Sequence, residues 1–340
     1  MFTNKMKRIL KYFLFGFSFF LLLFAFYFFV GKAKPAEKIE WGVVFSQKHS
    51  QLLGLDWKEN FLAILDDLKA KNLKIITHWD LIQPKENEYS FDDLDWQIKE
   101  AEKRNAKVIL VIGMKTGRWP ECHEPEWARN QKSKIKDQKL LEYIEKIVER
   151  YKNSKAIWAW QVENEPFFPF GVCPKIEKDL VKKEIELVKS LDSRPIIFGD
   201  SGEFSFWINA AKFGDIVGTT LHRKVYFKEI KKYITYPLPP VYYWRKAKLI
   251  DFFFGKKVII TELQAEPWCK NLIYNCDLEE QKITMDLEQF KKNVDFAKNT
   301  GMDKIYLWGS EWWYWLKEKQ NDPKIWDAAK NLICGSNTSF

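Results

Sequence analysis

The 340-residue sequence lacks the motifs that mark several common classes of protein. It contains neither a paired Cys-x-x-Cys nor a His-Glu-x-x-His motif, which are common frames of a zinc site. No glycine-rich phosphate loop follows any strand-like segment, which argues against a nucleotide-binding open sheet. We therefore expect a protein that needs neither a metal ion nor a cofactor.

A concentrated basic stripe is also missing, although the formal net charge is +9. The lysines are scattered over helical segments and interleaved with acids, as on a solvated surface. Examples are Lys182-Lys183, Lys231-Lys232 and Lys291-Lys292. Zinc-finger and RNP-type motifs are absent as well, so we expect no nucleic-acid partner.

One long apolar run is present near the N-terminus, from Tyr12 to Val30. At the rise of a helix this uncharged segment is just long enough to cross the hydrocarbon core of a bilayer. It is longer than the apolar part of a usual signal peptide, and Gly31-Lys32-Ala33 is a poor cleavage site. We interpret the run as an uncleaved membrane anchor, with a cleaved signal peptide as the alternative.

The charges around this run predict its orientation. Four basic residues precede it, whereas the lysines that follow are mixed with acids, so the N-terminus is expected in the cytoplasm. We predict a cytoplasmic tail over residues 1–11, an anchor over 12–30, a linker over 31–38 and a folded domain over 39–340. That domain would lie outside the cytoplasm, at the cell surface or in the periplasm.

Five cysteines fit such a compartment. Cys122 and Cys173 fall in the loops expected after the third and fourth strands, and Cys269 and Cys276 bracket a short loop. We predict these two disulfides, with Cys334 left over. Five unpaired thiols are the alternative, because sequence alone does not fix the connectivity.

Strand-like and helix-like segments alternate from residue 39 to the end, with no internal linker and no solenoid-type repeat. Runs such as Val108–Ile112 are apolar on both faces, as buried parallel strands are. Amphipathic patterns over Leu140–Tyr151 and Ile283–Ala297 predict helices between the strands, the second ending before Gly301. The predicted strands are Gly42–Ser46, Lys74–Trp79, Lys107–Met114, Ile157–Glu165, Pro195–Asp200, Ile216–Leu221, Lys257–Leu263 and Lys304–Gly309.

Eight such units in one chain predict the α/β fold class, and within it a (β/α)8 TIM barrel preceded by one transmembrane helix. A doubly wound open sheet is the alternative. In a (β/α)8 barrel the catalytic residues lie at the C-terminal ends of the strands. We therefore look for catalytic residues at the C-terminal ends of the predicted strands.

Two glutamates lie where predicted strands give way to loops. Glu165 ends the fourth strand in Trp160-Gln161-Val162-Glu163-Asn164-Glu165-Pro166, and Glu262 lies near the end of the seventh. Glycoside hydrolysis needs one carboxylic acid to protonate the leaving oxygen and one carboxylate to meet the developing positive charge. The pair predicts that chemistry, and the alternative is two surface carboxylates at loop starts. Glu163 lies two positions before Glu165, so on a strand its side chain is on the same face, and we interpret it as an inward structural acid.

Asn164-Glu165-Pro166 at the end of a fourth strand, with a glutamate at the end of a seventh, resembles clan A of the glycoside hydrolases. These are cellulase-like (β/α)8 enzymes that retain the anomeric configuration, and the resemblance covers the chain from about Ile39 onward. It implies that Glu165 is the acid/base, Glu262 the nucleophile and Asn164 a hydrogen-bond donor to the sugar 2-hydroxyl. Trp308, ending the eighth strand, matches the clan's tryptophan platform beneath the reacting sugar, with a core tryptophan as the alternative.

The sequence departs from the clan's pattern in two places. Many members carry an arginine near the nucleophile on the second strand, where this chain has His78 and Trp79 as candidates to take that space. The clan's usual tyrosine near the end of the sixth strand stands in a His-x-Tyr spacing, whereas here Tyr226 follows His222 at a greater distance. His222 is also compatible with a core histidine.

The loop after the third strand, Gly117–Glu121, offers Arg118 and Trp119 as further substrate-binding candidates, or is simply ordered by its proline. Taken together, the sequence predicts a membrane-anchored retaining glycosidase acting on β-linked oligo- or polysaccharides. Two alternatives remain open: a carbohydrate-binding or scaffolding barrel without turnover, and a transglycosylase.

Overall fold

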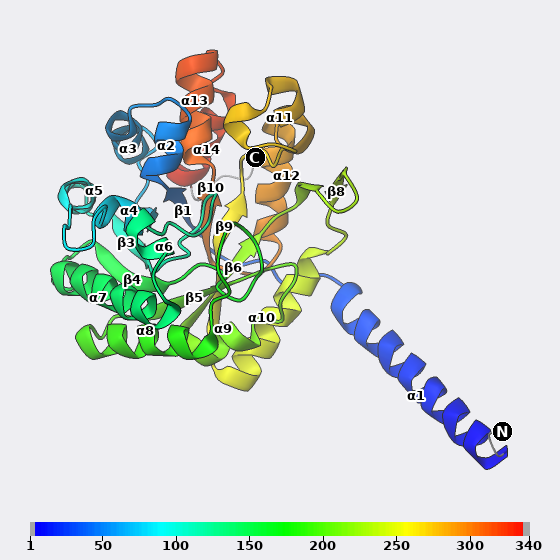
Figure 1. The fold of residues 1–340 in the computed structure, drawn as a ribbon. Helices are drawn as coiled ribbons and strands as arrows, with labels where there is room; N and C mark the ends of the chain where they lie inside the picture. Colours follow the sequence, from blue (N-terminus) through cyan, green and yellow to red (C-terminus); the bar gives the residue numbers. More distant parts are fainter. Residues whose placement is uncertain (1–3, 336–340) are drawn as a thin grey trace.

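Eight parallel strands close into a barrel in the order β1-β10-β9-β6-β5-β4-β3-β2, and helices surround it (Figure 1). The computed structural model describes residues 4–335. The barrel strands are β1 (Glu40–Phe45), β2 (Asn72–Ile76), β3 (Lys107–Ile112), β4 (Ile157–Val162), β5 (Ile196–Asp200), β6 (Ile216–Leu221), β9 (Lys257–Gln264) and β10 (Lys304–Trp308). The predicted (β/α)8 fold is confirmed.

The helices lie mostly in the connections between these strands, and several begin at a capping aspartate. The Asp56 carboxylate accepts the backbone N–H of Lys58 at 2.8 Å, at the start of α3. The helices are α1 (Asn4–Phe29), α2 (Gln47–Leu52), α3 (Trp57–Asp66), α4 (Trp79–Ile82), α5 (Asp92–Lys103), α6 (Glu126–Arg129), α7 (Ser133–Tyr151), α8 (Lys178–Leu191), α9 (Ile208–Phe213), α10 (Pro240–Phe254), α11 (Leu278–Thr284), α12 (Leu287–Lys298), α13 (Ser310–Gln320) and α14 (Lys324–Cys334), with a 3₁₀ turn at Ile273–Asn275.

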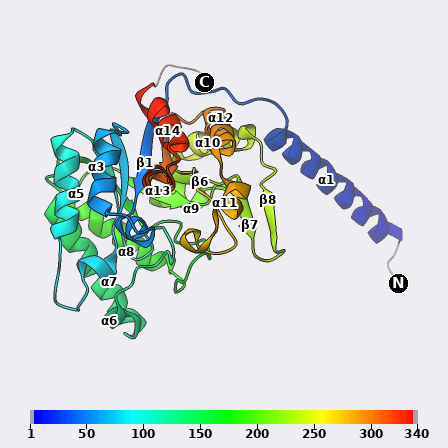
Figure 2. The same cartoon turned by 90° about the horizontal axis from the view of Figure 1, so that it is seen from above.

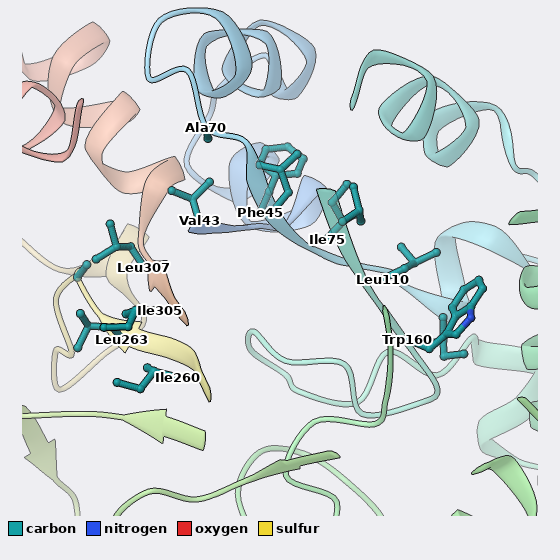
Figure 3. Packing of buried hydrophobic residues seen from close by; sticks show 14 of the residues in the cluster. Val43, Phe45, Ala70, Ile75, Leu110, Trp160, Ile260, Leu263, Ile305 and Leu307 are labelled. Carbon is teal, nitrogen blue, oxygen red and sulfur yellow. The ribbon is translucent and has the colours of Figure 1, made fainter. Parts of the chain in front are cut away.

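The strands bury apolar side chains on both faces, which explains their continuous apolar runs. On β1, Val43 and Phe45 point outward into the layer between strands and helices, part of which is seen in Figure 3, while Val44 packs inside the barrel. On β3, Leu110 belongs to the outer layer, and its neighbour Ile109 to the barrel interior. This alternation follows from the two-residue period of a strand.

Three details differ from the sequence-based expectation. The second strand ends at Ile76, so the prediction that it continues to Trp79 is wrong, and Trp79 instead begins α4. The helix predicted over Ile283–Ala297 is interrupted, because Asp286 caps α12 by accepting the N–H of Gln289 at 2.7 Å. An antiparallel hairpin, β7 (Lys224–Phe227) and β8 (Lys232–Thr235), was not predicted at all.

The hairpin lies beside α11 (Figure 2), where Tyr233 donates a hydrogen bond to Glu280 at 2.5 Å. Both predicted disulfides are formed, Cys122–Cys173 and Cys269–Cys276, and Cys334 is an exposed free thiol. The two bridges tie down loops that follow β3, β4 and β9. The loops at this end of the barrel are therefore covalently restrained.

The N-terminal helix α1 projects away from the barrel (Figure 1). Its segment Arg8–Phe29 is long and apolar enough to cross a membrane, a property that signal sequences share. The predicted anchor thus corresponds to a real helix, and the choice between anchor and signal stays a prediction. Residues 1–3 of the predicted tail lie outside the described residues.

Candidate active site

A cavity of about 980 Å³ lies at the C-terminal ends of the barrel strands. Its lining comes from the loops after β3, β4, β5 and β9, from the β7–β8 hairpin and from the last residue of β10. Eight of the ten side chains proposed from sequence line it: Asn164, Glu165, Glu262, Trp308, His222, Tyr226, Arg118 and Trp119. His78 and Trp79 are not among the lining residues.

Glu165 is almost enclosed, with 8% of its surface exposed. Burial, and after it the nearby negative charge of Glu262, raise the pKa of its carboxyl to about 8. Thr220 on β6 donates a hydrogen bond to its Oε1 at 3.1 Å. Glu165 therefore carries its proton at neutral pH and can act as an acid.

The turn that presents Glu165 is held by Glu163. Glu165 has a left-handed backbone with φ of +46°, and Glu163 has one with φ of +59°. This conformation raises the energy of any residue that carries a side chain. The Glu163 carboxylate accepts the backbone N–H groups of Met114 at 2.7 Å and of Lys115 at 2.6 Å. Glu163 thus ties the end of β4 to the end of β3, as expected of an inward structural acid.

Glu262 is paired with a buried lysine from the second strand. Lys74 Nζ lies 2.6 Å from Glu262 Oε1, and the lysine side chain is fully buried. Lys74 thereby places a positive charge on the second strand, where the clan's pattern has an arginine, and sequence reasoning missed it. The available signal was a lysine inside the apolar segment Leu73–Ile76, since a fully buried lysine normally needs a partner.

Asn164 is oriented by two donors. Its Oδ1 accepts hydrogen bonds from Gln161 Nε2 at 2.9 Å and from Lys74 Nζ at 3.2 Å, so its amide nitrogen points elsewhere. A β-carbon built on Gly117 would lie 3.4 Å from that nitrogen and 3.5 Å from Glu262 Oε1. The amide N–H group and the carboxylate therefore meet at one place, which suits donation to a hydroxyl group of a ligand beside Glu262.

Arg118 lies against the ring of Trp308. Its guanidinium is buried, donates to Glu266 and, at 2.8 Å, to Glu311, and lies 4.3 Å from the centre of the Trp308 ring. Because both carboxylates and the ring occupy this guanidinium, Arg118 positions Trp308 more than it offers a free charge to a ligand. Trp119 is 37% exposed at the cavity.

The two histidines proposed from sequence have different places. His222 packs edge-on against Trp308, with ring centres 5.7 Å apart. Burial acts to lower its pKa, but the carboxylates of Glu203, Glu165 and Glu262 outweigh burial and leave the pKa raised. His78 is buried beside Ser46, 3.1 Å from its hydroxyl, and burial lowers the pKa of His78 well below its usual value.

The two remaining aromatic candidates also lie in different places, one in the core and one at the cavity. Trp79 is fully buried in the core, with its ring 5.5 Å from that of Tyr143 and its Nε1 donating to Gln83. Tyr226 lines the cavity from the β7–β8 hairpin, where its ring lies 5.1 Å from Tyr233. Tyr226 thus faces the cavity from an inserted element rather than from β6, and Trp79 does not face it.

Glu121 is a third carboxyl of the cavity that sequence reasoning did not single out. It is 8% exposed, and burial raises its pKa to about 7. Within residues 4–335, its carboxyl oxygens make no hydrogen bond or ion pair. A β-carbon on Gly171 would lie 2.5 Å from the Glu121 side chain, so the loop after β4 fits closely against it and needs glycine there.

Parts of the chain are similar to known proteins. The profile of glycosyl hydrolase family 10 matches residues 36–183, a stretch that includes Glu165 and ends before Glu262. Mannan endo-1,4-beta-mannosidase A of Emericella nidulans is 27% identical over 127 residues, which are 33% of this chain and 31% of that protein. The match thus spans about a third of this curated relative.

Solved structures share the barrel. Xylanase 10B from Thermotoga maritima superposes with a TM-score of 0.55 at 16% identity, over 80% of this chain and 83% of that one. GH5_18 from Streptomyces cattleya, in complex with GlcNAc, gives a TM-score of 0.58 at 10% identity, over 81% and 71% of the two chains. At such identities the likeness shows a common fold.

We expect Lys74→Met to destabilise the protein by about 3 to 5 kcal/mol at neutral pH, because it leaves the buried Glu262 carboxylate without its cation. The double variant Lys74→Met/Glu262→Gln should recover most of that loss. Urea unfolding of the parent, both single variants and the double variant measures the coupling. Equal stabilities for Lys74→Met and the double variant would mean that the pair contributes no charge interaction.

We expect Glu165→Gln to stabilise the protein at about pH 8 but not at about pH 5. In the window between the ordinary pKa of 4.5 and the folded value of about 8, only the folded state holds the proton. The free energy of unfolding therefore falls as pH rises through this window, and glutamine removes that loss, by about 2 to 4 kcal/mol. Thermal unfolding at both pH values tests this. Glu186→Gln, on the exposed side of α8, should show no comparable pH dependence.

Proposed function

The chain is a member of clan A of the glycoside hydrolases, and on that premise we propose that it is a retaining glycosidase acting on β-linked saccharides. One observation carries the proposal. Two carboxyls face the same cavity in different surroundings, Glu165 with a pKa raised by burial and Glu262 in an ion pair with Lys74. Such a division is what a two-carboxylate glycosidase requires.

In the first step, Glu165 donates its proton to the glycosidic oxygen while a Glu262 oxygen attacks the anomeric carbon. The bond between that carbon and the leaving oxygen breaks, and a glycosyl ester of Glu262 forms. Asn164, oriented with its amide nitrogen beside Glu262, donates to the sugar 2-hydroxyl. Hydrogen bonds of this kind strengthen as positive charge develops on the sugar.

In the second step, Glu165 acts as a base. It takes a proton from water, whose oxygen attacks the anomeric carbon and displaces Glu262 as a carboxylate. Glu165 regains its proton, and the product keeps the original configuration. A sugar hydroxyl in place of water would give transglycosylation, which uses the same residues.

The substrate class follows from the lining of the cavity and from the relatives. Trp119, Trp268 and Trp308 all line it, and indole rings stack well on sugar rings. A volume of about 980 Å³ has room for more than one sugar residue. Since the relatives include a mannan endo-1,4-beta-mannosidase and a xylanase, we propose a β-1,4-linked polysaccharide of that kind as the substrate.

We also propose that Glu121 binds the substrate. Its carboxyl lines the cavity without a protein partner among the described residues, and a close-fitting glycine, Gly171, packs against it. The adjacent Cys122–Cys173 disulfide fixes the two loops that meet there. A sugar hydroxyl would satisfy the hydrogen-bonding capacity of this buried group.

The location of the enzyme completes the proposal. Two disulfides are typical of a compartment outside the cytoplasm, which agrees with a domain carried on the outer side of a membrane by α1. The bilayer and a polysaccharide are the proposed partners.

We expect the full chain to release reducing sugar from one or more members of a panel of β-mannans, xylans, β-glucans and aryl β-glycosides. Glu262→Ala should abolish turnover, and Glu165→Ala should reduce it most for substrates with poor leaving groups, which need the acid. The activity kcat/KM should fall above about pH 8, as Glu165 loses its proton. Proton NMR of the first product should show the anomeric configuration of the substrate.

Two outcomes would contradict this proposal. Saccharide binding without turnover across the whole panel would favour a carbohydrate-binding barrel, and inverted product would exclude Glu262 as the nucleophile. If sugar acceptors consume the glycosyl group faster than water does, the chain is a transglycosylase.

We expect Glu121→Ala to raise KM about tenfold while kcat changes less, because the lost contact is made to bound substrate in both ground and transition states. Glu124→Ala is the matched control, since Glu124 stands in the same loop but pairs with Lys136 instead of lining the cavity. Steady-state kinetics on the best substrate of the panel measures both. An unchanged KM in Glu121→Ala would remove Glu121 from the binding site.

A further inference from the structure

The C-terminal end of α1 is packed against the barrel. Phe28 is 3% exposed, with its ring 5.6 Å from Tyr242 on α10 and 6.0 Å from Phe206 in the loop before α9. Arg245 lies over the ring of Tyr27 and donates to the Phe26 carbonyl at 3.3 Å. These contacts fix how the barrel sits on the helix, so the barrel is not merely tethered by the linker.

Phe206 contacts α1 at a point before its C-terminal end. Its ring lies 6.2 Å from Phe24, which is more than one turn before the end of α1 at Phe29. If the apolar segment up to Phe29 spans a bilayer, this part of the barrel lies at the depth of the bilayer surface. Phe206 is nevertheless 48% exposed, which suits an apolar side chain that meets lipid.

Further exposed apolar side chains lie on the same side. Ile208 on α9 is 49% exposed, and Phe252 and Phe253 at the end of α10 are 81% and 69% exposed. Figure 1 shows α9 and the C-terminal end of α10 along the lower side of the barrel, the side toward which α1 leaves. We define the α9–α10 face by these four residues, Phe206, Ile208, Phe252 and Phe253.

Basic side chains accompany this face. Lys212 on α9 and Lys248 on α10 are exposed, and Lys256 follows α10. Two acids lie among them, Asp251 on α10 and Asp215, whose Oδ1 is 3.9 Å from Lys256 Nζ. Aromatic side chains flanked by lysines are typical of the membrane–water interface, where the rings enter the headgroup region and the ammonium groups meet anionic lipid. This combination favours a lipid surface over a protein partner.

We propose that the α9–α10 face is seated in the headgroup region of the bilayer that α1 spans. The proposal rests on α1 being a membrane anchor, and it is independent of the proposed hydrolysis. α1 and the face then hold the barrel at two places, which fixes the direction in which the cavity opens relative to the membrane. The barrel would meet its substrate from a constant orientation close to the cell surface.

The full chain in lipid nanodiscs of phosphatidylcholine and phosphatidylglycerol provides the test. In a Cys334→Ser background, which leaves both disulfides intact, a nitroxide is attached at Phe253→Cys or, separately, at Phe252→Cys. The matched control is a nitroxide at Ile283→Cys, which is 40% exposed on α11, on the opposite side of the barrel (Figure 1). Unchanged thermal unfolding of each labelled chain confirms that the barrel is folded.

We expect the ratio of collisions with oxygen to collisions with a water-soluble nickel complex to be several-fold higher at positions 252 and 253 than at 283. Equal ratios in a chain that resists carbonate extraction would overturn the seating of the face while leaving the anchor in place. Extraction by carbonate would overturn the anchor and the face together. Turnover on the saccharide panel is measured on the same samples, so neither result is confused with a failure of the proposed hydrolysis.

Discussion

The ion pair between Lys74 and Glu262 is the interaction on which the site depends. Both groups are buried, and a charge in the interior of a barrel is tolerated only beside its opposite. The charge of Glu262 adds to the effect of burial in raising the pKa of Glu165. One buried contact between β2 and β9 thus holds one of the two carboxyls on which the proposed chemistry rests, and that carboxyl acts on the pKa of the other.

Three further groups that face the cavity also have a buried partner behind them. Lys74 and Gln161 orient Asn164, Arg118 lies against Trp308, and Thr220 donates to Glu165. These partners lock the side chains before any ligand arrives. Such preorganisation is what makes electrostatic stabilisation of a transition state effective.

The barrel and the positions of Glu165 and Glu262 could be predicted because they depend on local patterns. Apolar runs with the right flanks define strands, and strand ends define where a barrel places its chemistry. Lys74 could not be assigned its role in this way. Its partner is 188 positions away in the sequence, and only closure of the barrel brings β2 and β9 to one cavity.

Trp79 was predicted to lie in the site, but it lies in the core. Its position at the end of a predicted strand suggested the cavity, but β2 ends three residues earlier and the chain turns into α4, which takes the indole into the core. Glu121 escaped notice because its place depends on a left-handed backbone, with φ of +76°, and on a glycine in another loop, neither of which has a local pattern. The parts of the site that the sequence did not predict therefore depend on strand boundaries and on loop conformation.

The elements that were hardest to predict are also those that would choose the substrate. The β7–β8 hairpin and the loop closed by Cys269–Cys276 form one wall of the cavity, and Trp268, the residue before that loop, stands 6.0 Å from Trp308. The two indoles extend the apolar lining outward from the two carboxyls. In the proposed reaction the carboxyls act on any correctly placed β-linked bond, so discrimination among sugars would come from this wall.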